Sequence, residues 1–516
     1  MSNKLVARAA LLVLAVSILG RLAGFVREQV IAIIFGTSMQ TDAYLMAFTL
    51  PNLFYVVIGG ALATAFIPVF TSQTVNKGTN DASRTASTII NLTALAMLVL
   101  TILGMAASPL LISGIAHGFS PEAKALTVKL SIIMFPCVLF MAVSLLLGGV
   151  LNSLKHFAAP AFTSVAFSLT IIAIIYILAP ELGIYALALG TLLGCIMQVI
   201  IQLPVLRRRG VKYSLSIDTS DPAVRQVGKL MLPAMIGTTV NQIYIVVDRL
   251  LASGLPVGSI AALNFANKLM YLPYNLFVFA VNTAVFPVLA EHASRQRFND
   301  LGKTTVFGLN LIAFFTIPAA VGLGVLSRPL VILLFQHGAF DQRSTEMTVF
   351  ALNFFVIGLF AQGAYNIINR TYFAMQDTRT PVLVSLLVVG LNVIFSLVLI
   401  QFLAHGGLAL ANALASTVNM CLIYWFLRRR LPELPERQLF LTLGKIIAAS
   451  SVMGLAVYGS RVVLSSWLGM ATLISQGLVV ALAIIIGLVV YTAAILPMKI
   501  EEVEYVKSRM LSRLSR

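Results

Sequence analysis

Long apolar runs recur along the whole chain of 516 residues and alternate with short polar segments. Most runs hold about 20 residues or more, the length of helix that crosses a hydrocarbon core about 30 Å thick. A membrane β-barrel would instead show short segments in which apolar and polar positions alternate. The pattern predicts an all-α polytopic membrane protein with 14 transmembrane helices, at 5–36, 42–74, 84–108, 121–151, 158–180, 183–207, 224–253, 257–292, 302–326, 344–375, 381–402, 407–430, 438–463 and 470–496.

The composition agrees with this pattern. Hydrophobic residues make up 59% of the chain and charged residues only 10%, and the mean hydropathy is +0.97, whereas a soluble protein carries about 25% charged residues. The cysteines Cys137, Cys195 and Cys421 stand apart in apolar segments and predict no disulfide framework. No HExxH motif, P-loop or GxSxG motif occurs. We therefore expect a protein that is not an enzyme and does not hydrolyse ATP itself.

Basic residues are distributed unevenly between the predicted loops, as expected because cytoplasmic loops collect lysine and arginine. If the N-terminus is cytoplasmic, the inner loops and tails hold 25 of the 35 basic residues and the outer loops hold three. Both termini are therefore predicted to be cytoplasmic, and the net charge of +17 does not require a nucleic acid partner. The RRR runs at 207–209 and 428–430 are interpreted as topology anchors, with an added role in gripping anionic lipid headgroups as a second interpretation.

Internal repeats divide the chain into two halves. Three pairs of segments resemble each other at an offset of six spans: 183–209 with 406–430, 63–70 with 282–289, and 151–162 with 368–383. An even offset preserves orientation, so the halves are parallel six-helix bundles. The predicted domains are an N-lobe (1–209), a C-lobe that follows a basic cytoplasmic linker (210–430), and helices 13–14 with a cytoplasmic tail (431–516). Two such bundles are typical of a transporter with its substrate site between them near mid-depth.

The first span carries three charged residues, Arg21, Arg27 and Glu28. A charge at bilayer depth costs a few kcal/mol or more, so it faces a watery cavity or pairs with a partner. Arg21 and Glu28 are two helical turns apart and share a face, and a bend at Gly20 and Gly24 would bring both arginines toward one cavity. The competing interpretation is an intramembrane Arg–Glu pair that only holds spans together.

Further charges are predicted within or at the ends of other spans: Asp42 opens the second span, Asp248 and Arg249 lie on the seventh, and Lys268 lies on the eighth. The guanidinium group of arginine is planar, makes paired hydrogen bonds and stays protonated in a dry site, which suits a diphosphate. Arginines with a lysine around a central cavity therefore indicate an anionic substrate. These residues alone do not distinguish phosphate from carboxylate.

A sodium ion is a further hypothesis, because hard cations prefer oxygen ligands. Asp248 would supply a carboxylate, with Asn392, Ser396 and Asn412 on the eleventh and twelfth spans as oxygen-bearing neighbours. Asn392 and Ser396 are one helical turn apart. The alternative interpretation is a set of interhelical hydrogen bonds without an ion.

Several stretches resemble the MurJ (MviN) family of bacterial lipid II flippases. These are GRLAGFVREQVIAIIFGTSMQTDAYLMAFTLPNLF (20–54), ATAFIPVF (63–70), LMLPAMIG (230–237), VVDRLLAS (246–253) and LLFQHGAFD (333–341). The resemblance implies a fold of the MOP exporter superfamily, with two pseudo-symmetric six-helix lobes in a V plus two C-terminal helices. It also implies transport of lipid II, undecaprenyl-diphosphate bearing the disaccharide pentapeptide, from the cytoplasmic to the outer leaflet.

The resemblance also implies roles for individual residues. Arg21 and Arg27 match the family's essential first-helix arginines, and Asp42 matches its acid in T-D-A. Lys268 stands where many members have arginine, which keeps the charge but loses bidentate geometry. Glu28 stands where the family often has aspartate.

Three positions depart from the family pattern. Tyr55 replaces what is a further cavity arginine in some members, Tyr271 replaces what can be a glutamate, and Ser396 replaces what can be a carboxylate. The charge network of the cavity is therefore expected to differ from the family's, and the sodium site to be weaker.

The leading hypothesis is a lipid II flippase of the bacterial inner membrane that works by alternating access as a monomer, with lipid II and membrane lipids as its partners. Alternatives are a flippase for another diphosphate-linked glycolipid, or a cation-coupled exporter of the same superfamily. A net basic cavity counts against an exporter of organic cations. An envelope enzyme or scaffold would need a catalytic motif or a large soluble domain. The energy source stays open between membrane potential and sodium.

Overall fold

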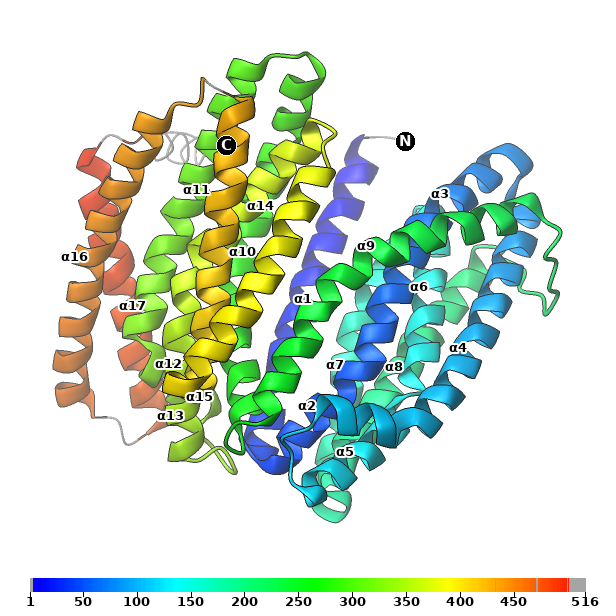
Figure 1. Ribbon diagram of the computed structural model, residues 1–516, viewed down its shortest axis with the longest axis horizontal. Coiled ribbons are helices and arrows are strands. Elements are labelled where there is room, and N and C mark those ends of the chain that lie inside the picture. Colours follow the sequence, from blue (N-terminus) through cyan, green and yellow to red (C-terminus); the bar gives the residue numbers. More distant parts are fainter. Residues whose placement is uncertain (1–2, 432, 470–471, 499, 501–516) are drawn as a thin grey trace. The chain divides into compact units, whose positions relative to one another are not determined.

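The computed structural model describes residues 3–431, 433–469, 472–498 and 500. The side chains of 3–14, 77, 79, 80, 236, 237, 240 and 241 also lie outside the description, as does most of the predicted cytoplasmic tail. Throughout the described ranges the regular secondary structure is helical (Figure 1). The predicted all-α fold is therefore confirmed.

Eleven described helical segments are long and apolar enough to cross a membrane. One of them, α15 (Arg379–Arg430), contains the two predicted spans 381–402 and 407–430, which are separated by a non-helical backbone at Ala404 with φ 46° and ψ −127°. Helices α1 (Asn3–Phe35) and α9 (Pro222–Ser253) coincide with predicted spans but are not among the eleven. The helices thus follow the predicted pattern, while the total of 14 transmembrane helices stays a prediction.

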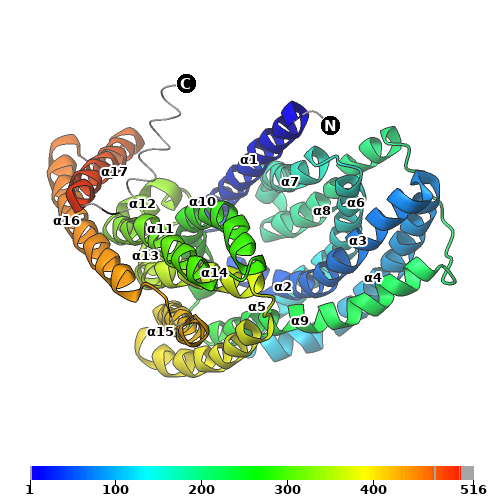
Figure 2. The same cartoon turned by 90° about the horizontal axis from the view of Figure 1, so that it is seen from above.

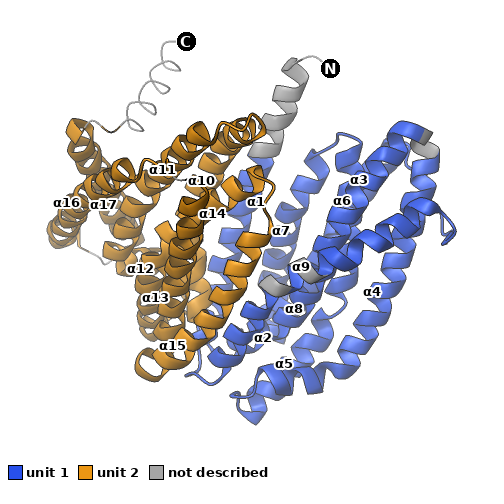
Figure 3. Cartoon of the chain, turned by 45° about the horizontal axis from the view of Figure 1, so that its top comes forward, with its two compact units in different colours: residues 1–261 blue, residues 262–516 orange. Residues whose placement is uncertain are grey.

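The chain forms two compact units, residues 1–261 and 262–516 (Figure 3). The division falls just after the start of α10 (Ser259–Ser294). In addition to α1 and α9, unit 1 contains α2 (Met39–Phe54), a π-helix (Tyr55–Gly59), α3 (Gly60–Lys77), α4 (Thr79–Ile115), α5 (Pro121–Met134), α6 (Cys137–Ser153), α7 (Ala158–Leu182) and α8 (Ile184–Arg208).

Within unit 1, α7 packs against both α1 and α8, and α3 packs against α9. Figure 2 shows α7 and α8 side by side. Phe66, Phe70, Leu147 and Val150 form the centre of a buried cluster to which α9 contributes Val227. The helix that follows the linker therefore shares a core with the second to sixth predicted spans.

Predicted span 42–74 is one continuous path with a change of helix type. Pro51 lies inside α2 and lacks the backbone N–H that would continue the hydrogen-bond ladder. The π-helix Tyr55–Gly59 follows directly. Insertions of this type accompany kinks and often mark functional positions in helices, and this one begins at Tyr55, where we predicted a departure from the family's charge pattern.

Unit 2 holds the rest of α10 and α15, with α11 (Phe298–Val325), α12 (Ser327–Phe335), α13 (Gln342–Phe355), a 3₁₀ turn (Val356–Gly358), α14 (Leu359–Ala374), α16 (Glu436–Leu468), α17 (Leu473–Ile495) and a 3₁₀ turn (Leu496–Met498). Helix α11 packs against α14 and α16, and α16 packs against α17. The hydroxyl of Tyr491 on α17 donates to the carbonyl of Phe314 on α11 at 2.9 Å. The last two helices are thereby fixed to this unit through α11.

The unit boundary at 261/262 differs from the predicted lobe boundary at 209/210. The units reflect which helices pack together, whereas the lobes were predicted from repeats in the sequence. The division into lobes at 1–209, 210–430 and 431–516 stays a prediction.

Candidate functional site

Arg27 and Glu28 of α1 form an ion pair in unit 1. A guanidinium nitrogen of Arg27 lies 2.7 Å from Oε1 of Glu28, and the two side chains are 17% and 8% exposed. The guanidinium carbon of Arg27 also lies 5.3 Å from the ring centroid of Phe167 on α7, within the range of a cation–π contact. Glu28 therefore binds its sequence neighbour Arg27, and the expectation that Glu28 and Arg21 share a face stays a prediction.

Arg21 differs from this pair because its side chain is exposed on unit 1. Residues 21–28 of α1 carry two arginines and one carboxylate, Glu28, so this stretch of the helix has a formal surplus of one positive charge. A surplus charge at span depth is costly in lipid and stable beside water or an anion. This surplus is the feature of the described site that suits an anionic substrate.

Gly20 and Gly24 of α1 serve close packing against α7. A Cβ at Gly20 would lie 2.3 Å from Oγ of Ser164, and one at Gly24 would lie 3.9 Å from Oγ of Ser168. Small residues four apart let two membrane helices approach closely. The contact at Gly20 is too short for a Cβ, whereas the one at Gly24 is an ordinary contact, so close packing requires glycine at position 20 only.

Asp42 is buried at the start of α2 and binds the backbone at the start of α10. Its Oδ2 accepts from the N–H of Gly258 at 2.6 Å, and its Oδ1 accepts from the N–H of Ala261 at 2.8 Å. A carboxylate at these free N–H groups stabilises a helix start and its positive dipole end. Its predicted role in substrate binding stays a prediction.

Two neighbours shape this contact. Gly258 has φ +92°, and a Cβ there would lie 2.3 Å from the carbonyl oxygen of Thr37, so only glycine fits. Thr41 turns inward and donates to the carbonyl of Gly36 at 2.9 Å, which closes the turn between α1 and α2. The sequence analysis identified Asp42 but missed Thr41 and Gly258. A prediction of the tight turns at these positions would have been needed to find them.

Asp248 and Arg249 lie near the end of α9, both partly buried. Arg249 is within electrostatic range of Asp248 and Asp42. The structure thus gathers one base and two acids in unit 1. The positive charge of Arg249 therefore weakens the attraction that Asp248 would have for a cation.

The other predicted sodium ligands belong to unit 2. Asn392 and Ser396 are buried on α15 at 6% and 2% exposure, and Oδ1 of Asn412 accepts from the amide of Gln362 at 3.2 Å. Among the described residues, no group of three or more His, Cys, Asp or Glu could hold a metal. The four ligands fall in different units, so a shared sodium site stays a prediction.

Lys268 lies partly buried on α10 in unit 2. One turn further on, the ring of Tyr271 meets that of Tyr274 edge to face, with centroids 5.4 Å apart. The amide of Asn366 donates to the hydroxyl of Tyr274 at 2.8 Å, and the amide of Asn282 reaches Oδ1 of Asn366 at 3.4 Å. The structure therefore shows a polar chain along α10 and α14 that residue reasoning missed.

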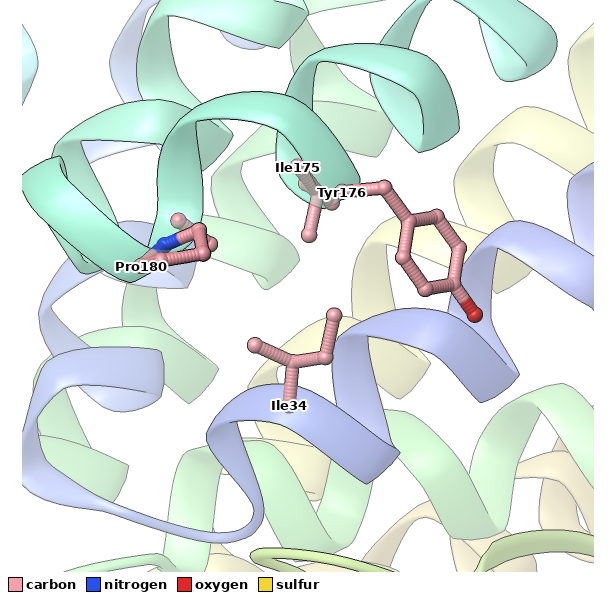
Figure 4. A pocket seen from close by; sticks show the side chains of 5 residues that line it. Ile34, Ile175, Tyr176 and Pro180 are labelled. Atoms are coloured by element: carbon pink, nitrogen blue, oxygen red, sulfur yellow. The ribbon is translucent and has the colours of Figure 1, made fainter.

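A shallow apolar hollow lies between α1 and α7 (Figure 4). It is lined by Ile34, Ile175, Tyr176, Ala179 and Pro180. No charged side chain lines it, so it offers nothing to a diphosphate. The described features that suit an anion are instead the basic residues of α1 and α10.

The chain is similar to known proteins over most of its length. A family model described as lipid II flippase MurJ matches residues 31–478. A probable lipid II flippase MurJ of Haemophilus influenzae is 30% identical over 88% of this chain and 92% of its own length. One of Rhizobium tropici is 31% identical over 84% and 83%. The lipid II flippase MurJ of Burkholderia cenocepacia is 30% identical over 82% and 84%.

Solved structures agree with these matches. A lipid II flippase MurJ in an inward closed conformation superposes with a TM-score of 0.79 at 27% identity, over 94% of this chain and 98% of that chain. An inward-facing multidrug transporter of the MATE family, in the MOP superfamily, has a TM-score of 0.70 at 14% identity, over 83% of this chain and 99% of that one. The second likeness concerns the fold alone. Because the family model spans most of the sequence, this chain belongs to the MurJ family of lipid II flippases.

Proposed function

We propose that this protein moves lipid II from the cytoplasmic to the outer leaflet of the bacterial inner membrane by alternating access, with Arg21, Arg27 and Lys268 binding the diphosphate. The observation that supports this most directly is the surplus positive charge on α1, where Arg21 is exposed and Arg27 is held by Glu28. Guanidinium groups make short, charge-assisted hydrogen bonds to phosphate oxygens. The polyprenyl tail would stay in lipid while the polar headgroup crosses.

Arg27 is suited to contribute orientation as well as charge. Glu28 and the ring of Phe167 hold its guanidinium group in place. A group whose position is already fixed loses less entropy when it binds a ligand. Arg21 is exposed and is the better candidate for the first contact with an anion. The matching base from unit 2 is Lys268, which supplies a point charge without a bidentate fork.

The direct test is transport by purified protein in liposomes, measured with fluorescent lipid II and an outside quencher. We expect Arg21→Gln to slow transport at least about tenfold, because one charge-assisted contact is worth roughly 1.5–3 kcal/mol. Arg21→Lys should retain part of the rate. Arg295→Gln is the matched control, since Arg295 is an exposed base paired with Glu291 outside α1.

The same variants can be tested for growth in a bacterium depleted of its own flippase. Wild type and Arg295→Gln should restore growth, and Arg21→Gln should not. Membrane abundance and melting temperature show whether each variant folds. Wild-type transport by a folded Arg21→Gln variant would remove Arg21 from the mechanism. Equal transport of an unrelated diphosphate-linked glycolipid would favour the broader substrate alternative.

A further inference from the structure

The segment between α8 and α9 leaves α8 by a defined turn. Gly210 has φ +75°, and its N–H donates to the carbonyl of Arg207 at 3.1 Å, while the N–H of Val211 donates to the carbonyl of Leu206 at 3.2 Å. This pairing ends a helix through a residue in the left-handed conformation. Val211 then packs on the buried cluster of unit 1. The chain from 212 onward therefore has a fixed starting direction.

The following residues are bound to α4. The N–H of Ser214 donates to Oγ of Ser87 at 3.2 Å. The amide of Asn91 donates to the carbonyls of Ser214 and Ser216 at 2.9 and 3.0 Å. Ser87 and Asn91 are one turn apart, so they present one face of α4 to the segment. Figure 1 shows this stretch of chain running beside α4 before α9 begins.

The predicted span 84–108 places these contacts near one membrane surface. Asn91 is two turns inside the predicted start of its span at residue 84, a rise of about 10 Å. The interfacial zones add roughly 5–7 Å on each side of the hydrocarbon core. Counted from residue 84, Ser87 lies about 5 Å and Asn91 about 10 Å along the helix, so a segment paired with both is expected between the headgroups and the outer part of the acyl chains.

The two faces of the segment differ in chemistry. Oγ of Ser214 lies 2.9 Å from Oγ of Ser216, so these side chains share one side. Alternation along an extended chain directs Leu215 and Ile217 to the other side, whereas the hydroxyl of Tyr213 donates to Oδ1 of Asn91 on α4 at 2.5 Å. The side chains of Leu215 and Ile217 are 84% and 51% exposed and form a short apolar row. Large apolar side chains this exposed are costly in water and mark a contact surface.

Exposed bases flank the apolar row. They are Arg207, Arg208, Arg209 and Lys212 before it, and Arg225 and Lys229 after it. A nearby acid, Asp221, is engaged with the hydroxyl of Thr85 at 2.6 Å. A topology anchor would explain the bases, but it would not explain why apolar side chains alternate outward among them. Apolar groups combined with Lys and Arg are typical of segments that lie in an anionic bilayer interface.

We propose that residues 207–217 form an interfacial strap that binds anionic phospholipid of the cytoplasmic leaflet. Leu215 and Ile217 insert beside the acyl chains, and the preceding arginines and Lys212 pair with headgroup phosphates. The cytoplasmic assignment rests on the topology of the proposed function. The strap holds the linker between the two repeat halves at the membrane surface during transport.

Fluorescence quenching by lipids brominated on their acyl chains tests the insertion in reconstituted full-length protein. A reporter is introduced by Leu215→Trp after Trp425→Phe and Trp467→Phe remove the native tryptophans. Ser220→Trp in the same background is the matched control, because Ser220 is exposed on the same loop without an apolar row. We expect brominated phosphatidylcholine to quench the 215 reporter at least about twice as strongly as the 220 reporter, and aqueous iodide to show the reverse order.

Stronger quenching of the 215 reporter by iodide than by brominated lipid overturns the proposal. Iodide quenching without bromolipid quenching at 215 would place the apolar row in water, where it would suit a protein partner. The measurement uses no lipid II and does not depend on which leaflet is contacted. The insertion test therefore stays valid even if the protein does not transport lipid II.

Lipid selectivity tests the charges. Bilayers of equal parts phosphatidylglycerol and phosphatidylcholine are made twice, with the bromine on one lipid or on the other. We expect the 215 reporter to prefer phosphatidylglycerol, and Arg208→Gln or Lys212→Gln to lower this preference by about fivefold per base. Arg295→Gln should leave it unchanged. A preference that survives loss of both Arg208 and Lys212 would refute headgroup binding by these residues.

Discussion

At the scale of single residues, the charges of α1 show how a membrane span can hold ionised groups. Arg27 and Glu28 neutralise each other at 2.7 Å, and Phe167 covers the guanidinium group from α7. Arg21 adds a second arginine to the same helix, with an exposed side chain. The charged turn therefore combines an ion pair, which positions one arginine, with an exposed arginine two turns away.

A charge-matched pair of variants separates structure from transport. Arg27→Gln takes the guanidinium from the nearly buried carboxylate of Glu28 and should lower stability by about 1.5–3 kcal/mol. The double variant Arg27→Gln with Glu28→Gln should regain much of that stability, since no unpaired charge remains. Transport should stay low in both. Thermal unfolding in detergent and liposome transport measure the two effects, and recovery of transport in the double variant would contradict diphosphate binding by Arg27.

At the scale of helices, close packing decides which small residues are needed. On α4, a Cβ at Gly104 would lie 2.1 Å from the ring of Phe135, a fully buried side chain, whereas one at Gly114 meets nothing within 4 Å. The two glycines lie on the same helix but in opposite packing environments. Their sequence contexts are both apolar and do not reveal the difference.

Alanine at these two positions should therefore have opposite effects. Gly104→Ala forces the ring of Phe135 or the helix to move and should cost about 1–3 kcal/mol. Gly114→Ala should be neutral or stabilise by up to about 1 kcal/mol, because alanine favours the helix. Melting temperatures of the purified variants compare them. Equal melting temperatures would show that Phe135 moves aside without cost.

An ion pair outside the predicted spans joins Asp377, which lies just before α15, to Arg430 at the end of α15. Oδ2 of Asp377 lies 2.6 Å from a guanidinium nitrogen of Arg430, and Oδ1 accepts from the N–H groups of Arg379 and Thr380 at 3.0 Å. Partial burial acts to raise the pKa of Asp377, but hydrogen bonds from Thr380 and the charge of Arg430 outweigh it and hold the pKa below its usual value.

A lowered pKa in the folded state predicts a direction for the pH dependence. The carboxylate of Asp377 contributes stability above its unfolded pKa of about 4, and this contribution is lost as pH falls through the lower folded value. Asp377→Asn should lower the melting temperature at neutral pH, and its curve should approach that of wild type toward about pH 3. Curves that stay parallel over this range would show that Asp377 does not carry the effect.

At the scale of the whole molecule, helices, repeats and loop charges together predict how the chain crosses the membrane. Eleven described segments qualify as spans, and α15 holds two predicted spans in one. The family membership establishes a multi-pass transporter fold. The predicted direction of insertion rests on the loop charges, because cytoplasmic loops collect basic residues.

Alkaline phosphatase fusions test this orientation, because the enzyme is active only outside the cytoplasm. A fusion after Arg516 should be inactive, and one inserted in the predicted outer loop at Arg343 should be active. A fusion at 210, in the basic linker, should also be inactive. Activity at both 210 and 516 would invert the proposed topology.

Sodium coupling is a second property of the whole molecule, since its predicted ligands lie in both units. If Asp248, Asn392, Ser396 and Asn412 bind sodium, the ion should stabilise the protein by about 1.4 kcal/mol at ten times its Kd. Asp248→Asn should abolish the difference between sodium and potassium in thermal unfolding. Equal unfolding of the wild type in both salts would retire the sodium hypothesis.

The sequence by itself determined the helical class, the positions of most spans and the break between 402 and 407. These depend on local hydropathy and on length, which every stretch of chain carries within itself. It also identified Arg21, Arg27 and Asp42 as unusual, because a charge in an apolar run is visible without a structure. Only the tertiary structure decided that Glu28 binds Arg27, that Asp42 holds the start of α10, and that α9 shares the core of unit 1. Those contacts depend on how helices approach and rotate, and such geometry is set by side chains far apart in the chain.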